Sequence, residues 1–79
     1  MFVAYALYSS KFDKIYIGYT SDLIDRFKSH NFHSPKGFTK NFRPWIVIYV
    51  DFFETKSAAM KREKELKWSR GRDFIRNQI

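Results

Sequence analysis

The residue types best suited to chemistry in this sequence are two tyrosines, an arginine and a glutamate, at Tyr5, Tyr16, Arg26 and Glu63. A guanidinium holds phosphate oxygens and the negative charge that develops on them. A carboxylate oxygen is a preferred ligand of a hard cation such as magnesium. A tyrosine is a poor base at its ordinary pKa of about 10, which a nearby cation lowers. A fold that gathers these four groups has the parts needed to act on a phosphate.

Glu63 lies on the apolar side of its predicted helix. On a helical wheel of residues 56–68, Glu63 falls within the stripe formed by Ala59 and Leu66, whereas Glu65 points well away from it. A carboxylate in such a place is costly unless it is ion-paired, hydrogen-bonded or bound to a metal. The alternatives to a metal site are an ion pair with a neighbouring lysine or arginine and a side chain that reaches past the stripe to water.

Two strands are predicted to position the tyrosines. Residues 2–8 present apolar side chains on both faces, which is typical of a strand that is central or covered on both sides. A polar hairpin loop follows, and residues 14–19 return as the second strand. Gly18 interrupts that strand, and a glycine there often marks a close approach to the backbone.

A helix is predicted to carry Arg26. It is capped at position 20 or 21 and runs to about residue 30 or 31, with an aspartate in its first turn. Leu23 and Phe27, four residues apart, mark its buried side. Arg26 and His30 flank that side and, being four residues apart, are neighbours.

Residues 31–44 form the longest irregular stretch, interrupted by two prolines and a glycine. Loops of this length in a small domain are usually functional or mobile. Cationic residues alternate there with three phenylalanines: Lys36, Lys40 and Arg43 with Phe32, Phe38 and Phe42. Such a mixture can stack bases and neutralise phosphates. The alternative is that the phenylalanines fold back as a lid on the core.

The C-terminal half is predicted to contain a strand and two helices. Residues 45–53 are almost continuously apolar, which favours a well-buried third strand. A helix then starts at position 55 or 57 and runs to about residue 69. Gly71 is a candidate helix end, and residues 72–79 can form a short terminal helix. The cations of this region, Lys67 and Arg70 among them, form a solvated face or follow a phosphate backbone.

Composition narrows the function classes. Seventy-nine residues predict a single domain spanning 1–79. A net charge of +7 and a pI near 9.9 favour a polyanionic partner. The absence of cysteine excludes disulfides and thiolate zinc sites and is consistent with a reducing cytoplasm. No apolar run is long enough for a membrane span, and no signal peptide is recognisable.

The ordered set of motifs resembles the GIY-YIG nuclease superfamily. The two signature tripeptides correspond to Val3-Ala4-Tyr5, which keeps only its tyrosine, and to Tyr16-Ile17-Gly18, which is intact. Ten residues separate Tyr5 from Tyr16. The resemblance covers essentially the whole chain through the following further segments: Tyr19 to Leu23, Arg26, His30-Asn31, Thr39-Lys40, Arg43 to Trp45 and Ala58 to Lys67. The chain is most similar to the small single-domain bacterial members of this superfamily, which are related to the catalytic domains of excision-repair nucleases and homing endonucleases.

The resemblance implies an α/β fold in which helices flank a small, three-stranded, largely antiparallel sheet. It also implies metal-dependent cleavage of DNA with Mg²⁺ or Mn²⁺, a link to DNA repair or processing, and no organic cofactor. The implied catalytic residues are Tyr5, Tyr16, Arg26, His30 and Glu63, with Glu63 as the metal ligand. Either tyrosine, or His30, is a candidate general base. The implied DNA-binding residues are Lys36, Lys40, Arg43, Lys67 and Arg70.

Two other functions agree with the same sequence. A nucleic-acid-binding module without catalysis requires only the basic helix and the phenylalanine-rich loop. A small scaffold that binds a protein partner or dimerises would gain stability that so short a chain has difficulty supplying alone. The motif set favours the nuclease over both.

Overall fold

The sheet is the frame on which the candidate residues are arranged. In the computed structural model, which describes residues 1–33 and 38–79, three antiparallel strands lie in the order β2-β1-β3. They are β1 (Phe2–Ser9), β2 (Lys14–Thr20) and β3 (Ile46–Phe53). β1 is central and its side chains are buried on both faces, as its apolar pattern predicted. The predicted α/β architecture with a small antiparallel sheet is thus confirmed.

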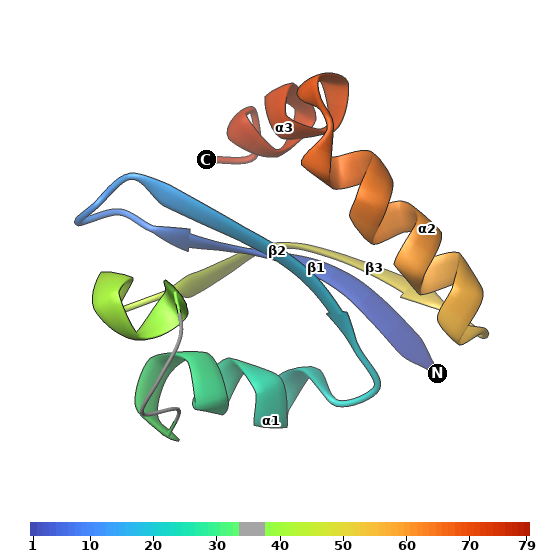
Figure 1. Cartoon of the computed structure of the whole chain (residues 1–79), viewed down its shortest axis with the longest axis horizontal. Helices are drawn as coiled ribbons and strands as arrows, with labels where there is room; N and C mark the ends of the chain where they lie inside the picture. Colours follow the sequence, from blue (N-terminus) through green and yellow to red (C-terminus); the bar gives the residue numbers. More distant parts are fainter. Residues whose placement is uncertain (34–37) are drawn as a thin grey trace.

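Helices cover both faces of this sheet (Figure 1). One face carries α1 (Leu23–Lys28), the π-helical turn η1 (Ser29–His33) and the 3₁₀ turn η2 (Phe38–Phe42). The other face carries α2 (Lys56–Lys67) and α3 (Ser69–Arg76). None of the helices in the described parts of the chain has the length and apolar character needed to cross a bilayer.

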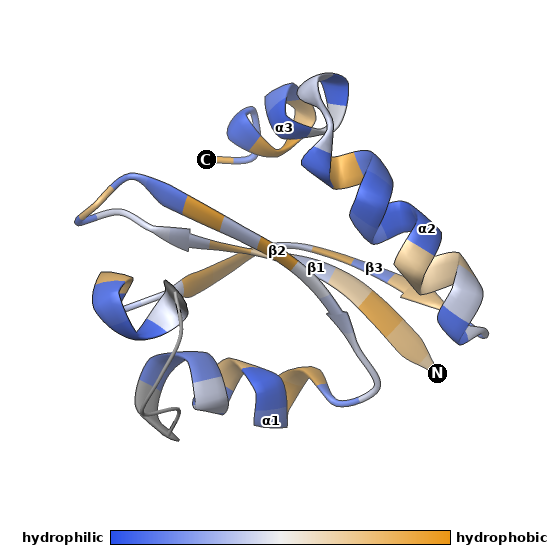
Figure 2. Ribbon diagram, viewed as in Figure 1, coloured by the Kyte–Doolittle hydropathy of each residue, from blue (hydrophilic) through white to orange (hydrophobic). Residues whose placement is uncertain are grey.

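Two separate clusters form the core, one on each face. The cluster under α2 and α3 is aliphatic and consists of Ala6, Ile17, Leu66 and Ile75. The cluster on the α1 face is built around Tyr5, Leu7 and Trp45. The hydropathy colouring in Figure 2 shows that α2 is mostly hydrophilic, so only a narrow side of it packs on the sheet. This agrees with the narrow apolar stripe seen in the sequence.

The first helix begins later and is shorter than predicted. Its N-cap is Asp22, not residue 20 or 21, because the Asp22 carboxylate accepts a hydrogen bond of 3.0 Å from the Asp25 amide. Thr20 turns the chain just before the cap, where its hydroxyl accepts from the Asp22 amide. The chain then widens into η1, and η2 follows, so part of the predicted irregular stretch 31–44 is helical.

The prediction that the third strand is well buried is wrong. β3 pairs only with β1 and is therefore an edge strand. Several of its apolar side chains are exposed, namely Ile46, Val47, Val50 and Phe52. A continuous apolar run predicts burial on both faces, but no residue of β3 is fully buried, and Ile48 and Tyr49 are the ones that pack on the aliphatic cluster. Trp45, directly before the strand, is fully buried instead.

Gly71 does not end the long helix as predicted. α2 starts after the Thr55 cap, and the break falls at Trp68, whose backbone is extended. Gly71 lies inside α3, where a Cβ atom would lie only 2.5 Å from the Leu66 Cα atom. The glycine therefore lets α3 pack against the end of α2, and its role is close approach and not helix termination.

Candidate active site

A cleft of about 610 Å³ opens where β2 leads into α1. Its walls come from β1, β2, α1 and α2, and four of the predicted catalytic residues line it: Tyr5, Tyr16, Arg26 and Glu63. These residues are spread over much of the chain, and the fold brings them to one cavity. The cleft lies at the edge of the sheet, because β2 pairs with β1 alone.

Gly18 leaves space in this cleft for Tyr5. The two residues are opposite each other in the β1–β2 ladder. A Cβ atom at position 18 would lie 2.7 Å from the Tyr5 hydroxyl oxygen and 3.2 Å from the Tyr16 ring. Any side chain there would displace one of the two tyrosines. The close approach predicted from this glycine is therefore confirmed.

Tyr5 is held by a buried hydrogen-bonded chain. Its hydroxyl lies 2.9 Å from Nε2 of His30, and Nδ1 of His30 lies 3.0 Å from the Thr39 hydroxyl. All three residues are buried. The chain connects the central strand to η1 and η2 and fixes the direction of the Tyr5 hydroxyl.

Burial favours the neutral forms of the Tyr5 phenol and the His30 imidazole. It raises the pKa of Tyr5 well above the ordinary value of a tyrosine; Tyr16 adds to this rise, Arg26 opposes it and Glu63 adds to it. Burial also lowers the pKa of His30, and the positive charges of Arg26 and Arg43 lower it further. Tyr5 and His30 therefore form a neutral hydrogen-bonded pair near pH 7.

Tyr16 is placed differently. Its ring is half-buried and packs against His30, with the ring centroids 4.6 Å apart, and lies 6.3 Å from the Tyr5 ring. Among the described residues, no side chain or backbone group is hydrogen-bonded to its hydroxyl. Arg26, on the exposed side of α1, lines the cleft with it. The tyrosine that lies open to the cleft is thus Tyr16.

Glu63 faces the cleft from α2 and is largely covered, its side chain being 17% exposed. One carboxylate oxygen lies 3.4 Å from Nζ of Lys67, one turn later. Glu65 is 51% exposed and pairs with Arg62 on a different side of the helix. The orientation predicted for both glutamates is confirmed, and the ion pair foreseen as the alternative for Glu63 is present.

The donor set of the cleft suits a hard cation that takes few protein ligands. Within residues 1–33 and 38–79 no cluster of three or more histidine, cysteine or acidic side chains is present. Magnesium often takes only one or two protein carboxylates and completes its shell with water and phosphate. Glu63 can supply that single carboxylate, so the residues present are compatible with a divalent ion.

The cations predicted to bind DNA are dispersed. Lys36 lies outside the described residues, and Lys40 is exposed on η2. Arg43 donates to the backbone carbonyls of His30 (2.6 Å) and Ser29, so it joins η1 to the start of β3. Lys67 reaches Glu63, and Arg70 lines a separate hollow between α2 and α3. The four of these residues that the structure describes do not form one surface.

The aromatic side chain at the end of the predicted loop is part of the core. Phe42 packs against the Tyr5 cluster, and its ring meets that of Phe12 edge-on with centroids 5.4 Å apart. For Phe42, the lid interpretation therefore holds. The side chains of Phe32 and Phe38 lie outside what the structure describes.

Sequence reasoning missed the buried residues that join η1, η2 and the start of β3 and so hold His30 in place. Asn31 accepts a hydrogen bond of 2.6 Å from the Trp45 amide and donates one of 3.0 Å to the Trp45 carbonyl. The Trp45 indole donates to the Thr39 carbonyl at 2.8 Å. Asn31, Thr39 and Trp45 all lie in segments that resemble the superfamily, and this was the sequence signal that could have identified them. The sequence alone assigned none of them a role.

Comparison with known proteins agrees with this arrangement. The family model of the GIY-YIG catalytic domain matches residues 1–74. A UPF0213 protein of Staphylococcus haemolyticus is 39% identical over 57 residues, covering 72% of this chain and 70% of that protein. A UPF0213 protein of Staphylococcus aureus is 42% identical over 53 residues; the match covers 67% of this chain but 65% of that protein, slightly less than two thirds. No solved structure matches this chain. The family predicted from the tyrosine motifs is thereby confirmed: this chain belongs to the GIY-YIG nuclease superfamily.

Proposed function

We propose that this protein is a metal-dependent DNA endonuclease that hydrolyses phosphodiester bonds in the cleft at the β2 edge. The observation that supports this most directly is the convergence of Tyr5, Tyr16, Arg26 and Glu63 on one cavity. A net charge of +7 favours a polyanionic substrate over a small neutral one. The cleft at the edge of the sheet suits DNA with an accessible backbone, such as flapped, branched or damaged duplexes in repair or processing.

Arg26 and Glu63 would bind the scissile phosphate from opposite walls. Arg26, on α1, donates to a non-bridging oxygen and stabilises the charge that builds up there. Glu63, on α2, would hold Mg²⁺ or Mn²⁺, which would supply positive charge to neutralise the phosphate and lower the pKa of nearby acids. Both side chains line the same cleft, as this division of roles requires.

Tyr16 is the better candidate for the general base. Its hydroxyl is open to the cleft, whereas the Tyr5 hydroxyl is buried and engaged with His30. The raised pKa of Tyr5 makes loss of its proton unfavourable. As the phenolate, Tyr16 would take a proton from the attacking water beside Arg26 and become the neutral phenol. Tyr5 and His30 would act as a neutral pair that positions the Tyr16 ring and contacts the water or phosphate.

A second function is favoured by one contact. The ion pair between Glu63 and Lys67 gives the carboxylate a partner without any metal. A DNA-binding module of the same fold, with no catalysis, would retain such a pair. Metal-dependent cleavage distinguishes the two functions.

The test is cleavage of labelled duplex, single-strand, flap and four-way-junction DNAs with Mg²⁺, Mn²⁺ or EDTA. Wild type is compared with Glu63→Gln and with Glu65→Gln, a matched control two residues away on an exposed side of α2. We expect cleavage that needs metal, loses about 10³-fold or more in Glu63→Gln and is unchanged in Glu65→Gln. Cleavage by Glu63→Gln at the wild-type rate would refute the metal-ligand role. Absence of cleavage by wild type, with salt-sensitive binding, would support the binding module.

The same assay separates the tyrosines. Removing a general base typically costs about 10²–10⁴-fold in rate. Tyr16→Phe should lose activity over that range and Tyr5→Phe should lose less, because Tyr5 supports the site without accepting the proton. The reverse order would make Tyr5 the base.

A further inference from the structure

A second groove, of about 650 Å³, continues along the same edge of the sheet. It lies between β2 and α3, away from the turn into α1. Four of the residues that line it are cationic, Lys14, Lys67, Arg72 and Arg76, and one, Asp13, is acidic. The groove therefore carries an excess of positive charge over a short length of strand.

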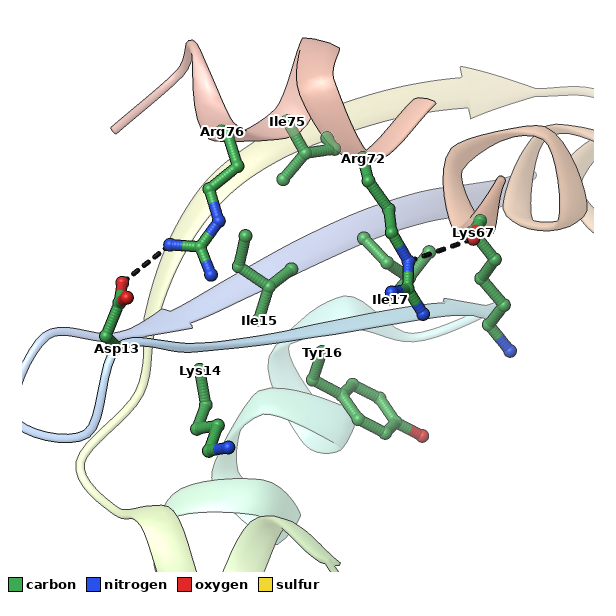
Figure 3. Close-up of a pocket in the computed structure, with 9 residues that line it drawn as sticks. All are labelled: Asp13, Lys14, Ile15, Tyr16, Ile17, Lys67, Arg72, Ile75 and Arg76. Atoms are coloured by element: carbon green, nitrogen blue, oxygen red, sulfur yellow. Dashed lines mark hydrogen bonds and ion pairs between the residues drawn. The ribbon is translucent and has the colours of Figure 1, made fainter. Parts of the chain in front are cut away.

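The cations lie on both sides of the exposed edge of β2. In Figure 3, Arg72 and Arg76 extend from α3 toward the strand, while Lys14 and Tyr16 extend from the opposite face of the strand. Isoleucines from β2 and α3 fill the space between them. Among residues 1–33 and 38–79, β2 pairs only with β1, so no described strand covers the backbone along this edge.

Arg72 is held in place but keeps donors for a ligand. Its Nε atom donates to the Lys67 carbonyl at 3.0 Å, which fixes the direction of the guanidinium. Within the described residues, nothing accepts from its two terminal nitrogens. Arg62 contrasts with it, because its guanidinium is taken up by the Tyr49 hydroxyl and the Asp51 and Glu65 carboxylates. Arg62 has a structural role, whereas Arg72 can bind an anion.

Two residues connect this groove to the candidate active site. Tyr16 lines both cavities. Lys67 lines the groove and is paired with Glu63, which lines the cleft. The two cavities thus form one path along β2, with the reacting groups at one end and the arginines of α3 at the other.

We propose that this groove binds the sugar–phosphate backbone of the DNA substrate on one side of the scissile phosphate. The proposal rests on the proposed nuclease function, because the cleft defines where the substrate enters. Lys14 and Gly18 are four positions apart, or about 13 Å along a strand. That length matches about four base-pair steps of a DNA strand. The bound substrate would therefore extend about four nucleotides beyond the cut on that side.

The test measures DNA binding in EDTA, where cleavage is blocked, over a range of salt concentrations. The variant Lys14→Gln/Arg72→Gln removes two groove cations. Its matched control, Lys28→Gln/Lys61→Gln, removes two exposed lysines that line neither cavity. Each lost phosphate contact lowers the slope of log K against log salt by about 0.9. For the groove variant, we expect the slope of log K against log salt to become less steep by about two, and for the control we expect the slope to be unchanged.

A third variant should act in the opposite direction. Asp13 is the groove carboxylate and binds Arg76 Nη1 at 2.6 Å. Asn keeps the shape of Asp and tolerates the positive φ of 52° found at this position. Asp13→Asn should therefore tighten DNA binding several-fold at low salt. A loss of folding cannot produce a gain in affinity, so this variant keeps the test valid if the double variant is unstable.

Equal slopes for wild type, groove variant and control, or unchanged binding by Asp13→Asn, would overturn the groove proposal even if the wild type cleaves DNA. If the salt slope decreases only in the groove variant and the wild type cleaves no DNA, the result would support the groove as a DNA-binding site and refute the nuclease function. A wild type that does not bind DNA at all would refute both.

Discussion

The two faces of the sheet are stabilised by different kinds of interaction. Under α2 and α3, the buried residues are aliphatic and pack without hydrogen bonds between side chains. Under α1, by contrast, buried polar groups alternate with large aromatics: His30, Asn31 and Thr39 lie among Tyr5 and Trp45. Both clusters share the central strand, on which Tyr5 and Ala6 point to opposite faces.

The difference between the faces follows from what each must position. The Tyr5 hydroxyl is held in one direction, which apolar packing alone does not supply and hydrogen bonds do. The α1 face therefore contains a connected network that reaches Tyr5. The aliphatic face needs only to hold α2 at a fixed distance, so that Glu63 reaches the cleft. One face of β1 thus fixes the orientation of the Tyr5 hydroxyl, and the other face fixes the distance of α2 from the sheet.

The largest effect on stability is expected on the aliphatic face. Leu66 is fully buried, and Leu66→Ala should lower the free energy of unfolding by about 2–5 kcal/mol. Leu23→Ala, on the half-buried side of α1, should cost clearly less, because less of its surface is removed from water. Urea unfolding followed by circular dichroism measures both. Equal losses would contradict the idea that Leu66 packs inside the aliphatic cluster while Leu23 packs only at the margin of the cluster on the α1 face.

A smaller loss of a different kind is expected at Asn31. Asn31→Ala leaves the Trp45 amide and carbonyl without their partner, at about 1–3 kcal/mol for a buried group left unsatisfied. Asn31→Asp keeps the acceptor for the amide but sets a second oxygen against the Trp45 carbonyl, so it should not restore wild-type stability. An Asn31→Ala variant as stable as wild type would show that the polar network is not needed for folding.

The parts of the fold that the sequence predicted are those with a simple period. The double-sided apolar pattern of residues 2–8 located the central strand, and the stripe of α2 located Glu63 correctly. The apolar run 45–53 misled, because composition cannot distinguish an edge strand with exposed apolar residues from a buried one. Pairing order is a long-range property, and no local pattern records it.

The candidate site also contains residues that the sequence identified and residues that only the fold reveals. Glu63 stood out because a carboxylate on an apolar face needs an explanation. Asn31 and Thr39 did not, because a polar residue in an irregular stretch is expected to be solvated, and only the fold buries them. The groove along β2 was equally hidden, since it exists only because α3 packs back on the sheet and places Arg72 along the edge that carries Lys14.

The smallest predicted effect is the pH dependence that arises from His30. The folded protein lowers the pKa of His30, so below the ordinary pKa of about 6.5 the unfolded chain binds more protons than the folded one. Stability should therefore be complete above pH 6.5 and decline as the pH falls toward the folded-state pKa. With one proton involved, the slope stays below about 1.4 kcal/mol per pH unit.

Urea-unfolding midpoints between pH 5 and pH 8 measure this slope, with His30→Gln as the variant that cannot titrate. The other histidine, His33, is present in both proteins and cancels in the difference. Wild type should lose stability relative to His30→Gln on acidification. A relative gain would mean that folding raises the pKa of His30, which would require an anionic partner and would remove the neutral Tyr5–His30 pair from the mechanism. Leu66→Ala should lower the whole curve without changing its slope, because aliphatic packing binds no proton.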